Sequence, residues 1–325
     1  MKKFLSIVFL LVAIQSGAQY NWDYGTKVGA ANYLGDIGGK ELTRRDFIWD
    51  MHVLSTRYSA GMYGRYKFSK RLAVSANADF IRITDTDDLT TNPARHARNM
   101  NFRNNIYEFG VRAELTVWYD NDVGNKGYYN PDFKMYLFGG LAGYYHNPQG
   151  QIFKDGELQY GGQWFDLRPW KTEGQEAQYD AFGLAIPAGL GMYMTFNKRW
   201  RVGWELCWRT TFTDYLDDVS TVYGLDPTAA TTDPLANEFV NQAAYQGLID
   251  EVNANNGLDG DMSLNDFRYY DPEQRSKRGD PTNNDSYISA QFTVGRVIRG
   301  RSNFYKSKYS YLKTRAGVRR SKAKF

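Results

Sequence analysis

The stretch NNIYEFGVRAELTVWYD, residues 104–120, decides the fold of this chain. From Tyr107 onward every second residue is apolar or aromatic, whereas Glu108, Arg112 and Glu114 lie between them. This period of two predicts a β-strand with one apolar face and one charged face. The apolar face could pack on a soluble core or contact lipid. If it contacts lipid, the charged face must point into an enclosed interior.

Residues 1–18 have the pattern of a secretory signal peptide. Lys2 and Lys3 precede an apolar run over residues 4–14, and small residues follow at 16–18. This run is too short to cross a bilayer as a helix. We therefore expect an exported protein whose mature chain begins directly after this segment.

The composition narrows the class of exported protein. The 325 residues are 16% aromatic and include 31 glycines, yet the mean hydropathy is −0.59. After the signal segment, no apolar run is long enough for a transmembrane helix. Cys207 is the only cysteine, so no intramolecular disulfide can form, and we interpret it as a small packing residue. These properties favour an outer-membrane β-barrel, in which lipid-facing and lumen-facing residues alternate.

The alternation recurs along the chain and predicts eight strands, at residues 24–35, 54–67, 71–84, 104–120, 133–145, 181–196, 199–213 and 286–298. The connections between them alternate in length, as expected for a barrel with short periplasmic turns and long external loops. An even number of strands places both termini in the periplasm. We therefore predict an all-β fold, an eight-stranded antiparallel transmembrane barrel over residues 19–298. Pro187 lies in the middle of the sixth strand, where a bulge or kink would accommodate it.

The two faces of the predicted strands differ in chemistry. The register places six large apolar residues toward lipid: Phe182, Leu184, Leu190, Met192, Trp204 and Trp208. An eight-stranded barrel is just wide enough for its own side chains to fill, and charges buried there need opposite charges. We therefore predict a closed lumen filled by a network of paired charges, formed by Asp79, Glu108, Arg112, Glu114, Arg201, Glu205 and Arg209.

No residue pattern indicates catalysis, and we expect a protein without a cofactor. A lipid-modifying barrel enzyme is an alternative. Such an enzyme would need a histidine near a serine and a carboxylate at the external rim. The three histidines, His52, His96 and His146, have no spacing that favours this arrangement over ordinary loop residues. A passive structural or adhesive barrel, similar to OmpA, is a second alternative.

Three acidic clusters in the loops, at residues 84–88, 120–122 and 259–266, could bind calcium. The last lacks the glycine and the bidentate glutamate of an EF-hand loop, so solvated loops are the preferred interpretation. The long external loop at 215–285 also contains an amphipathic pattern at 235–252 that predicts a helix.

The segment after the last strand, residues 299–325, is a basic tail without acidic residues. The predicted topology places it in the periplasm, which excludes nucleic acid as a partner and favours acidic protein surfaces or anionic lipid. A plain solvated tail is the alternative. Its ten basic residues are Arg299, Arg301, Lys306, Lys308, Lys313, Arg315, Arg319, Arg320, Lys322 and Lys324.

Three segments carry a resemblance to a known family: WDYGTKVGAANYLGDIGG at 22–39, TDYLDDVSTVY at 213–223 and RGDPTNNDSYISAQFTVGRVI at 278–298. They resemble the PorG-like outer-membrane barrels of the Bacteroidetes type IX secretion and gliding system. The resemblance implies a non-enzymatic barrel in contact with outer-membrane lipid. It also implies that the barrel anchors a periplasmic ring, built from a lipoprotein and its soluble partner. The long basic tail departs from the family pattern.

Overall fold

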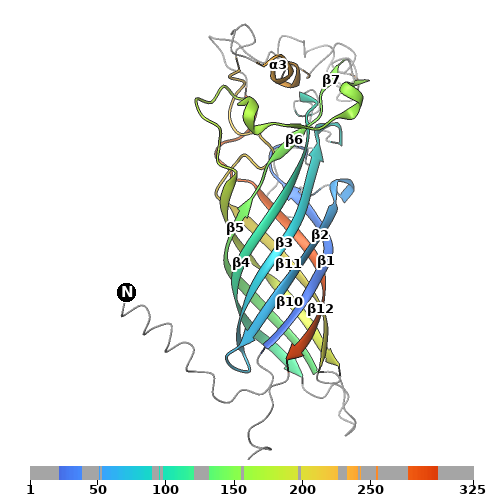
Figure 1. The fold of residues 1–325 in the computed structure, drawn as a ribbon, viewed down its shortest axis with the longest axis vertical. Coiled ribbons are helices and arrows are strands. Elements are labelled where there is room, and N and C mark those ends of the chain that lie inside the picture. The colour runs from blue at the N-terminus through green and yellow to red at the C-terminus, as the bar shows by residue number, and fades with distance from the viewer. Residues whose placement is uncertain are drawn as a thin grey trace, which may run out of the picture.

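The computed structural model shows a closed β-barrel of tilted strands, with loops and short elements gathered at one end (Figure 1). It describes residues 22–38, 51, 53–89, 95, 98–120, 132–154, 157–196, 199–225, 233–240, 242, 254 and 277–298. The signal segment, the tail at 299–325 and the whole acidic cluster at 259–266 lie outside these residues, together with the greater part of the predicted loop helix.

Eight strands form the barrel wall: β1 (Trp22–Leu34), β2 (Arg57–Lys67), β3 (Leu72–Thr86), β4 (Asn101–Asp120), β5 (Asp132–Tyr145), β10 (Phe182–Phe196), β11 (Trp200–Thr211) and β12 (Ser286–Ile298). Each strand pairs antiparallel with two neighbours. The first strand pairs with the last, and β3 pairs with β4, so the sheet has no free edge. The predicted eight-stranded antiparallel barrel is confirmed.

The opening stretch forms most of β4, where exposure alternates with each residue. Glu108 and Arg112 are buried in the lumen, whereas Phe109 and Val111 are exposed on the outer surface. Of the six residues expected to face outward, Phe182, Leu184, Leu190 and Met192 are exposed, and Trp204 and Trp208 are partly exposed.

Pro187 does not cause a bulge, so the first of the two adjustments expected from the sequence, a bulge or a kink, is wrong. Its strand keeps the same register with β5 on both sides, from Ala185↔Ala142 to Ala188↔Gly139. The bulge lies instead in β4, where the register with β5 shifts between Thr116 and Trp118. Proline removes one donor from the ladder, and the neighbouring pairs are sufficient to hold the register.

The described parts of the long connections build a cap over one end of the barrel, and the turn between β2 and β3 lies at the other end (Figure 1). The cap contains short strands β6 (Pro148–Gly150), β7 (Phe153–Lys154), β8 (Glu157–Leu158) and β9 (Phe165–Asp166), and helix α3 (Pro234–Val240). It also contains the 3-10 turns η2 (Val53–Ser55), η3 (Asp87–Leu89), η4 (Tyr160–Gly162) and η5 (Arg168–Trp170). Strand β6 continues the barrel sheet by pairing with β4.

The main apolar core lies at the cap end and not along the whole barrel. Phe239 of α3 is fully buried beside Trp170, with ring centroids 5.8 Å apart. Leu167 and Leu216, from two different long connections, belong to the same cluster of buried apolar residues. Within the described residues, no helix is long and apolar enough to cross a membrane.

Candidate functional site: a filled lumen and a buried polar cap

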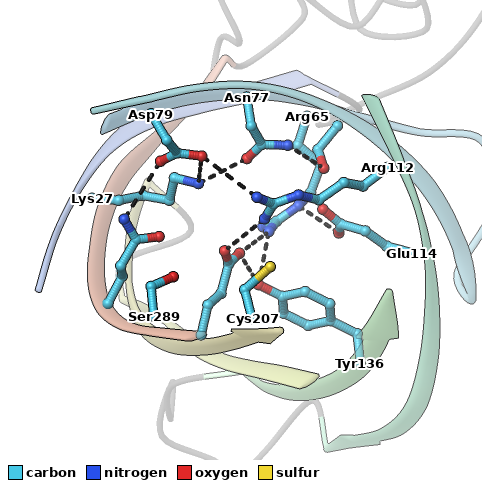
Figure 2. Close-up of polar contacts among 12 residues, drawn as sticks. Lys27, Arg65, Asn77, Asp79, Arg112, Glu114, Tyr136, Cys207 and Ser289 are labelled. Carbon is cyan, nitrogen blue, oxygen red and sulfur yellow. Dashed lines mark hydrogen bonds and ion pairs between the residues drawn. The ribbon is translucent and has the colours of Figure 1, made fainter. Parts of the chain in front are cut away.

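The lumen below the cap is filled by charged side chains from different strands (Figure 2). All seven residues expected there are buried, and each lies within ion-pair distance of an opposite charge: Asp79, Glu108, Arg112, Glu114, Arg201, Glu205 and Arg209. The alternation explains this placement, because every second residue of a barrel strand points inward.

Asp79 is the centre of one part of the network. Lys27 donates to its carboxylate at 2.9 Å and also to Asn77 at 3.1 Å. Arg112 and Arg209 approach the same carboxylate at 3.4 and 3.7 Å. One acidic group on β3 is therefore surrounded by three cations from β1, β4 and β11.

Arg65 on β2 is the centre of a second part (Figure 2). Its guanidinium lies 2.7 Å from Glu114 and 3.4 Å from Glu205. It also lies 3.3 Å from Asp23, which in turn pairs with Arg201. Asp23, Lys27 and Arg65 also belong to the network, although they were not among the seven residues expected there. The sequence does contain a signal for their inward position, because these residues alternate with the outward-facing residues of β1 and β2.

A third contact, between Glu108 and Arg209, lies at the cap end of the lumen. The two side chains are completely buried, and the closest atoms, Nε and Oε2, are 2.6 Å apart. Tyr287 of the last strand donates to the same carboxylate at 2.8 Å. Burying ions costs free energy unless they are paired and hydrogen-bonded. Here the two ions pair with each other, and Arg209 also donates to the hydroxyl of Ser289 at 2.7 Å.

The lumen is also closed where the strands meet the short turns. Tyr136 and Tyr193 fill the space beside Arg65, whose guanidinium carbon is 4.9 and 5.1 Å from their ring centroids. A cavity between these tyrosines, Lys67 and Lys134 has a volume of about 10 Å³. That is room for about one water molecule. The described residues therefore form a packed interior.

The cap contains a second polar network, built around two arginines. Arg98 binds both carboxylate oxygens of Asp87, at 2.7 and 2.8 Å. It also donates to the backbone carbonyls of Arg278 and Asp36, at 2.6 and 2.7 Å. This single side chain therefore joins three connections between strands. The nearby Asp85 accepts a hydrogen bond of 2.6 Å from the hydroxyl of Ser55. Both Asp85 and Asp87 therefore bind other groups of the protein.

Arg278 links the other long connections. It lies 3.2 Å from the carboxylates of Glu173 and Asp218, and donates to Thr172 at 2.8 Å. Glu173 in turn accepts from the backbone N–H groups of Ser220 and Thr221. The carboxylate of Glu173 therefore organises the turn that follows β11.

The three segments that carry the family resemblance meet in this cap. Ile37 donates its backbone N–H to Asp217 at 2.9 Å, and Asp280 donates its own to Asp36 at 2.6 Å. Burial raises the pKa of Asp217, and the nearby charge of Asp36 raises it further. Glycine is required at position 279, because an added Cβ would lie 2.6 Å from the backbone carbonyl oxygen of Ser220.

His146 does not have the environment of a catalytic base. Its Nε2 donates to the backbone carbonyl of Asp180 at 3.2 Å, so Nδ1 is the acceptor for the Asn104 amide at 3.3 Å. Burial lowers its pKa to about 4. The neutral, fully engaged ring lacks the exposed nitrogen that the lipid-modifying enzyme would require. His52 and His96 lie outside the described residues.

The calcium hypothesis receives no support from the described part of the chain, which contains no group of three potential metal-binding residues. Cys207 is buried in the lumen beside the network (Figure 2). This position agrees with its interpretation as a small packing residue.

These observations define the class: a closed eight-stranded β-barrel with an apolar outer surface, a lumen filled by ion pairs and a polar cap. The sequence model of a family described as a domain of unknown function (DUF6089) matches residues 1–224. The chain belongs to this family. A search of curated proteins found no match.

Solved structures of bacterial barrels are similar to this chain at low sequence identity. One is Ail, the attachment invasion locus protein of Yersinia pestis, in complex with the heparin analogue sucrose octasulfate. Its identity is 7% and its TM-score 0.33, over 85% of this chain and 98% of that chain. The outer membrane protein OprG from Pseudomonas aeruginosa has 10% identity and a TM-score of 0.32, over 87% and 99%. CarO2 of Acinetobacter baumannii has 12% identity and a TM-score of 0.25, over 83% and 99%.

Proposed function

We propose that the protein is an outer-membrane barrel, and its outer surface supports this placement. Large apolar side chains point outward from all eight strands. Leu141 is 70% exposed and Leu184 is 65% exposed. Soluble monomers rarely expose a contiguous apolar surface of this extent, whereas a transmembrane barrel needs such a band to contact lipid.

Aromatic side chains lie at both edges of this band, as they do in transmembrane barrels. At the short-turn edge, Trp22, Tyr66 and Phe68 contact one another, with successive ring centroids 4.8 Å apart. At the cap edge, Tyr145 lies between Phe182, at 5.2 Å, and Tyr107, at 6.5 Å. The two clusters mark two interfaces between lipid and water.

The filled lumen is the observation that carries the functional proposal. An interior occupied by ion pairs does not provide a passage for solutes, and His146 is unsuited to catalysis. The protein then acts through its two ends and its lipid-facing surface. A rigid, plugged barrel of this kind is suited to anchoring other proteins to the membrane.

The end with the short turns is basic and is the end that we assign to partner binding. Four cationic residues form what we call the short-turn rim: Lys70, Arg71, Lys134 and Arg199. The acidic residues Asp120 and Asp132 also lie at this end. A predominantly basic rim attracts an acidic surface over about a Debye length, roughly 8 Å at physiological salt. The expected topology places this rim in the periplasm, next to the basic tail.

The particular assembly that we propose is the type IX secretion system. The resemblance to the PorG-like barrels supports this assignment, and the partners would be the periplasmic ring lipoprotein and its soluble partner. The barrel would anchor this ring to the outer membrane without an enzymatic activity. The tail at 299–325 would add a second, salt-sensitive contact.

Cross-linking and co-purification from outer membranes test the proposal. We expect the double variant Lys70→Glu/Arg71→Glu to lose most of the periplasmic partner at low salt, because it reverses the charge of the rim. The matched control is Lys154→Glu/Lys277→Glu, which reverses two exposed lysines at the cap end. This control should retain the partner.

Deletion of residues 299–325 separates the role of the tail from that of the rim. We expect the barrel to stay folded and the partner to be held more weakly, with the largest difference at low salt. If the intact protein recovers no periplasmic partner, the proposed anchoring role is wrong. A stable, large conductance in planar bilayers would contradict the filled lumen on which the proposal depends.

A further inference from the structure

A groove crosses the outer surface of the barrel near the short-turn end. It lies over strands β11, β12, β1, β2, β3 and β4, and has a volume of about 690 Å³. Ligand sites in proteins occupy about 300–1,000 Å³. Its lining is predominantly apolar, with Met62, Phe109 and Trp200 as its large side chains.

The strand register explains why the surface is hollow at this position. Tyr24 pairs with Gly64 across the β1–β2 ladder, and Gly64 pairs with Ala76 across the next ladder. An added Cβ at Gly64 would meet nothing within 4 Å, so this glycine faces open space. Small residues on two neighbouring outward positions therefore leave a depression that larger side chains would fill.

Nearer the cap, the same strands carry large aromatic residues on their outer face. Tyr58 and Phe80 stack with ring centroids 5.9 Å apart, and Phe80 contacts Tyr107 at 5.2 Å. The groove is therefore a local feature of one half of this face.

A basic site continues the groove toward the short-turn edge. Tyr24 and Arg296 line both the groove and an adjoining pocket of about 360 Å³, which also contacts Arg199. Arg296 lies over the ring of Trp200, with its guanidinium carbon 5.8 Å from the ring centroid. Within the part of the chain that the structure describes, neither arginine has a carboxylate within ion-pair distance. Two cations thus lie beside an apolar groove, with no counter-ion among the residues that the structure describes.

We infer that this groove binds a single phospholipid from the membrane leaflet nearest the short turns. One acyl chain lies over Gly64 and Ala76, and the headgroup phosphate contacts Arg296 and Arg199. Arginine binds phosphate oxygens through charge-assisted hydrogen bonds, often two at once. The apolar lining matches the acyl chain of the phospholipid, and the adjoining arginines match its phosphate. The inference rests on the proposed membrane placement and goes beyond the anchoring role.

Lipid retention by the full-length protein tests the inference. The protein is extracted in a mild detergent, incubated with phosphatidylglycerol, washed, and examined by native mass spectrometry. We expect one retained phosphatidylglycerol on the wild type, and a several-fold lower occupancy on Gly64→Phe, whose new ring fills the groove. Gly139→Phe is the matched control, because Gly139 also faces open space but lies outside the groove.

A second pair of measurements tests the headgroup contact. We expect Arg199→Gln/Arg296→Gln to lower the retention of phosphatidylglycerol several-fold and to leave the weaker retention of diacylglycerol, which has no phosphate, unchanged. Gel mobility with and without heating confirms that each variant is folded. Equal retention of phosphatidylglycerol by the Gly64→Phe and Gly139→Phe variants would overturn the inference.

Two other outcomes would also overturn it. If Gly64→Phe abolishes a dimer and not lipid binding, the groove is an interface between two copies of the chain. If Arg199→Gln/Arg296→Gln retains as much phosphatidylglycerol as the wild type, the arginines do not bind the headgroup. A failure of the wild type to fractionate with outer membranes would instead contradict the proposed placement, which distinguishes the two hypotheses.

Discussion

Tyr33, near the end of the first strand, donates a hydrogen bond of 2.6 Å to Asp285, which directly precedes the last strand. Both side chains are fully or almost fully buried. Asp285 also accepts the backbone N–H of Leu216 at 2.9 Å. One carboxylate therefore ties the seam between the first and last strands to the connection that follows β11.

The variant Tyr33→Phe should weaken this seam. Removing the hydroxyl leaves a buried carboxylate oxygen without its donor, which costs about 1–3 kcal/mol. Urea unfolding in lipid vesicles measures the change. The control is Tyr145→Phe, at an exposed position on the outer surface. Similar unfolding free energies for the two variants would show that the hydrogen bond does not stabilise the seam.

The pair of Glu108 and Arg209 should show strong coupling in the lumen. Glu108→Gln or Arg209→Met alone leaves one buried charge without its closest partner, and we expect each to cost about 3–5 kcal/mol. The double variant should cost less than the sum of the two. A double-mutant cycle of unfolding free energies gives the coupling. If the costs of the two single variants simply add in the double variant, Glu108 and Arg209 do not stabilise the barrel as an ion pair.

The outward register can be tested at Leu190, near the middle of β10. We expect Leu190→Arg to lower the free energy of unfolding from vesicles by about 2–4 kcal/mol, because the charge would face the bilayer midplane. Thr210→Arg, at an exposed position near the cap edge, should cost about 0–1 kcal/mol. Equal costs would show that the apolar band does not contact lipid.

His146 should make the cap sensitive to acid. Its pKa is lowered from 6.5 to about 4, mainly by burial, with a smaller contribution from Arg168. The unfolded chain therefore takes up a proton first as the pH falls. The neutral ring therefore contributes about 3 kcal/mol to the free energy of unfolding above pH 6.5, and this contribution is lost progressively as the pH falls toward 4.

The measurement compares the unfolding free energy of the wild type with that of His146→Gln across this pH range. Glutamine retains a donor for Asp180 and an acceptor for Asn104 but does not titrate. The wild type should lose stability relative to the variant as the pH falls from 6.5 to 4. Parallel curves would show that the histidine is protonated equally in both states.

The positions and faces of the barrel strands could be determined from the sequence alone. In β4 the alternation of Tyr107, Phe109 and Val111 with charged residues is a property of the extended backbone, in which successive side chains point to opposite sides. It needs no knowledge of the neighbouring strands. The same local rule placed Glu108 and Arg112 inside. Pro187 shows its limit, because whether a missing donor causes a bulge depends on the strands at either side.

Only the tertiary structure decided which charges pair and where the cap forms. Lys27 contacts Asp79, 52 residues away, and Tyr33 contacts Asp285, 252 residues away. Such contacts depend on the stagger of the strands and on closure of the barrel, which fix the height of each inward side chain. A periodic pattern specifies the direction of a side chain but not this height. The groove beside Gly64 depends on tertiary structure for the same reason, since Gly64 and Ala76 become neighbours only through the pairing of β2 with β3.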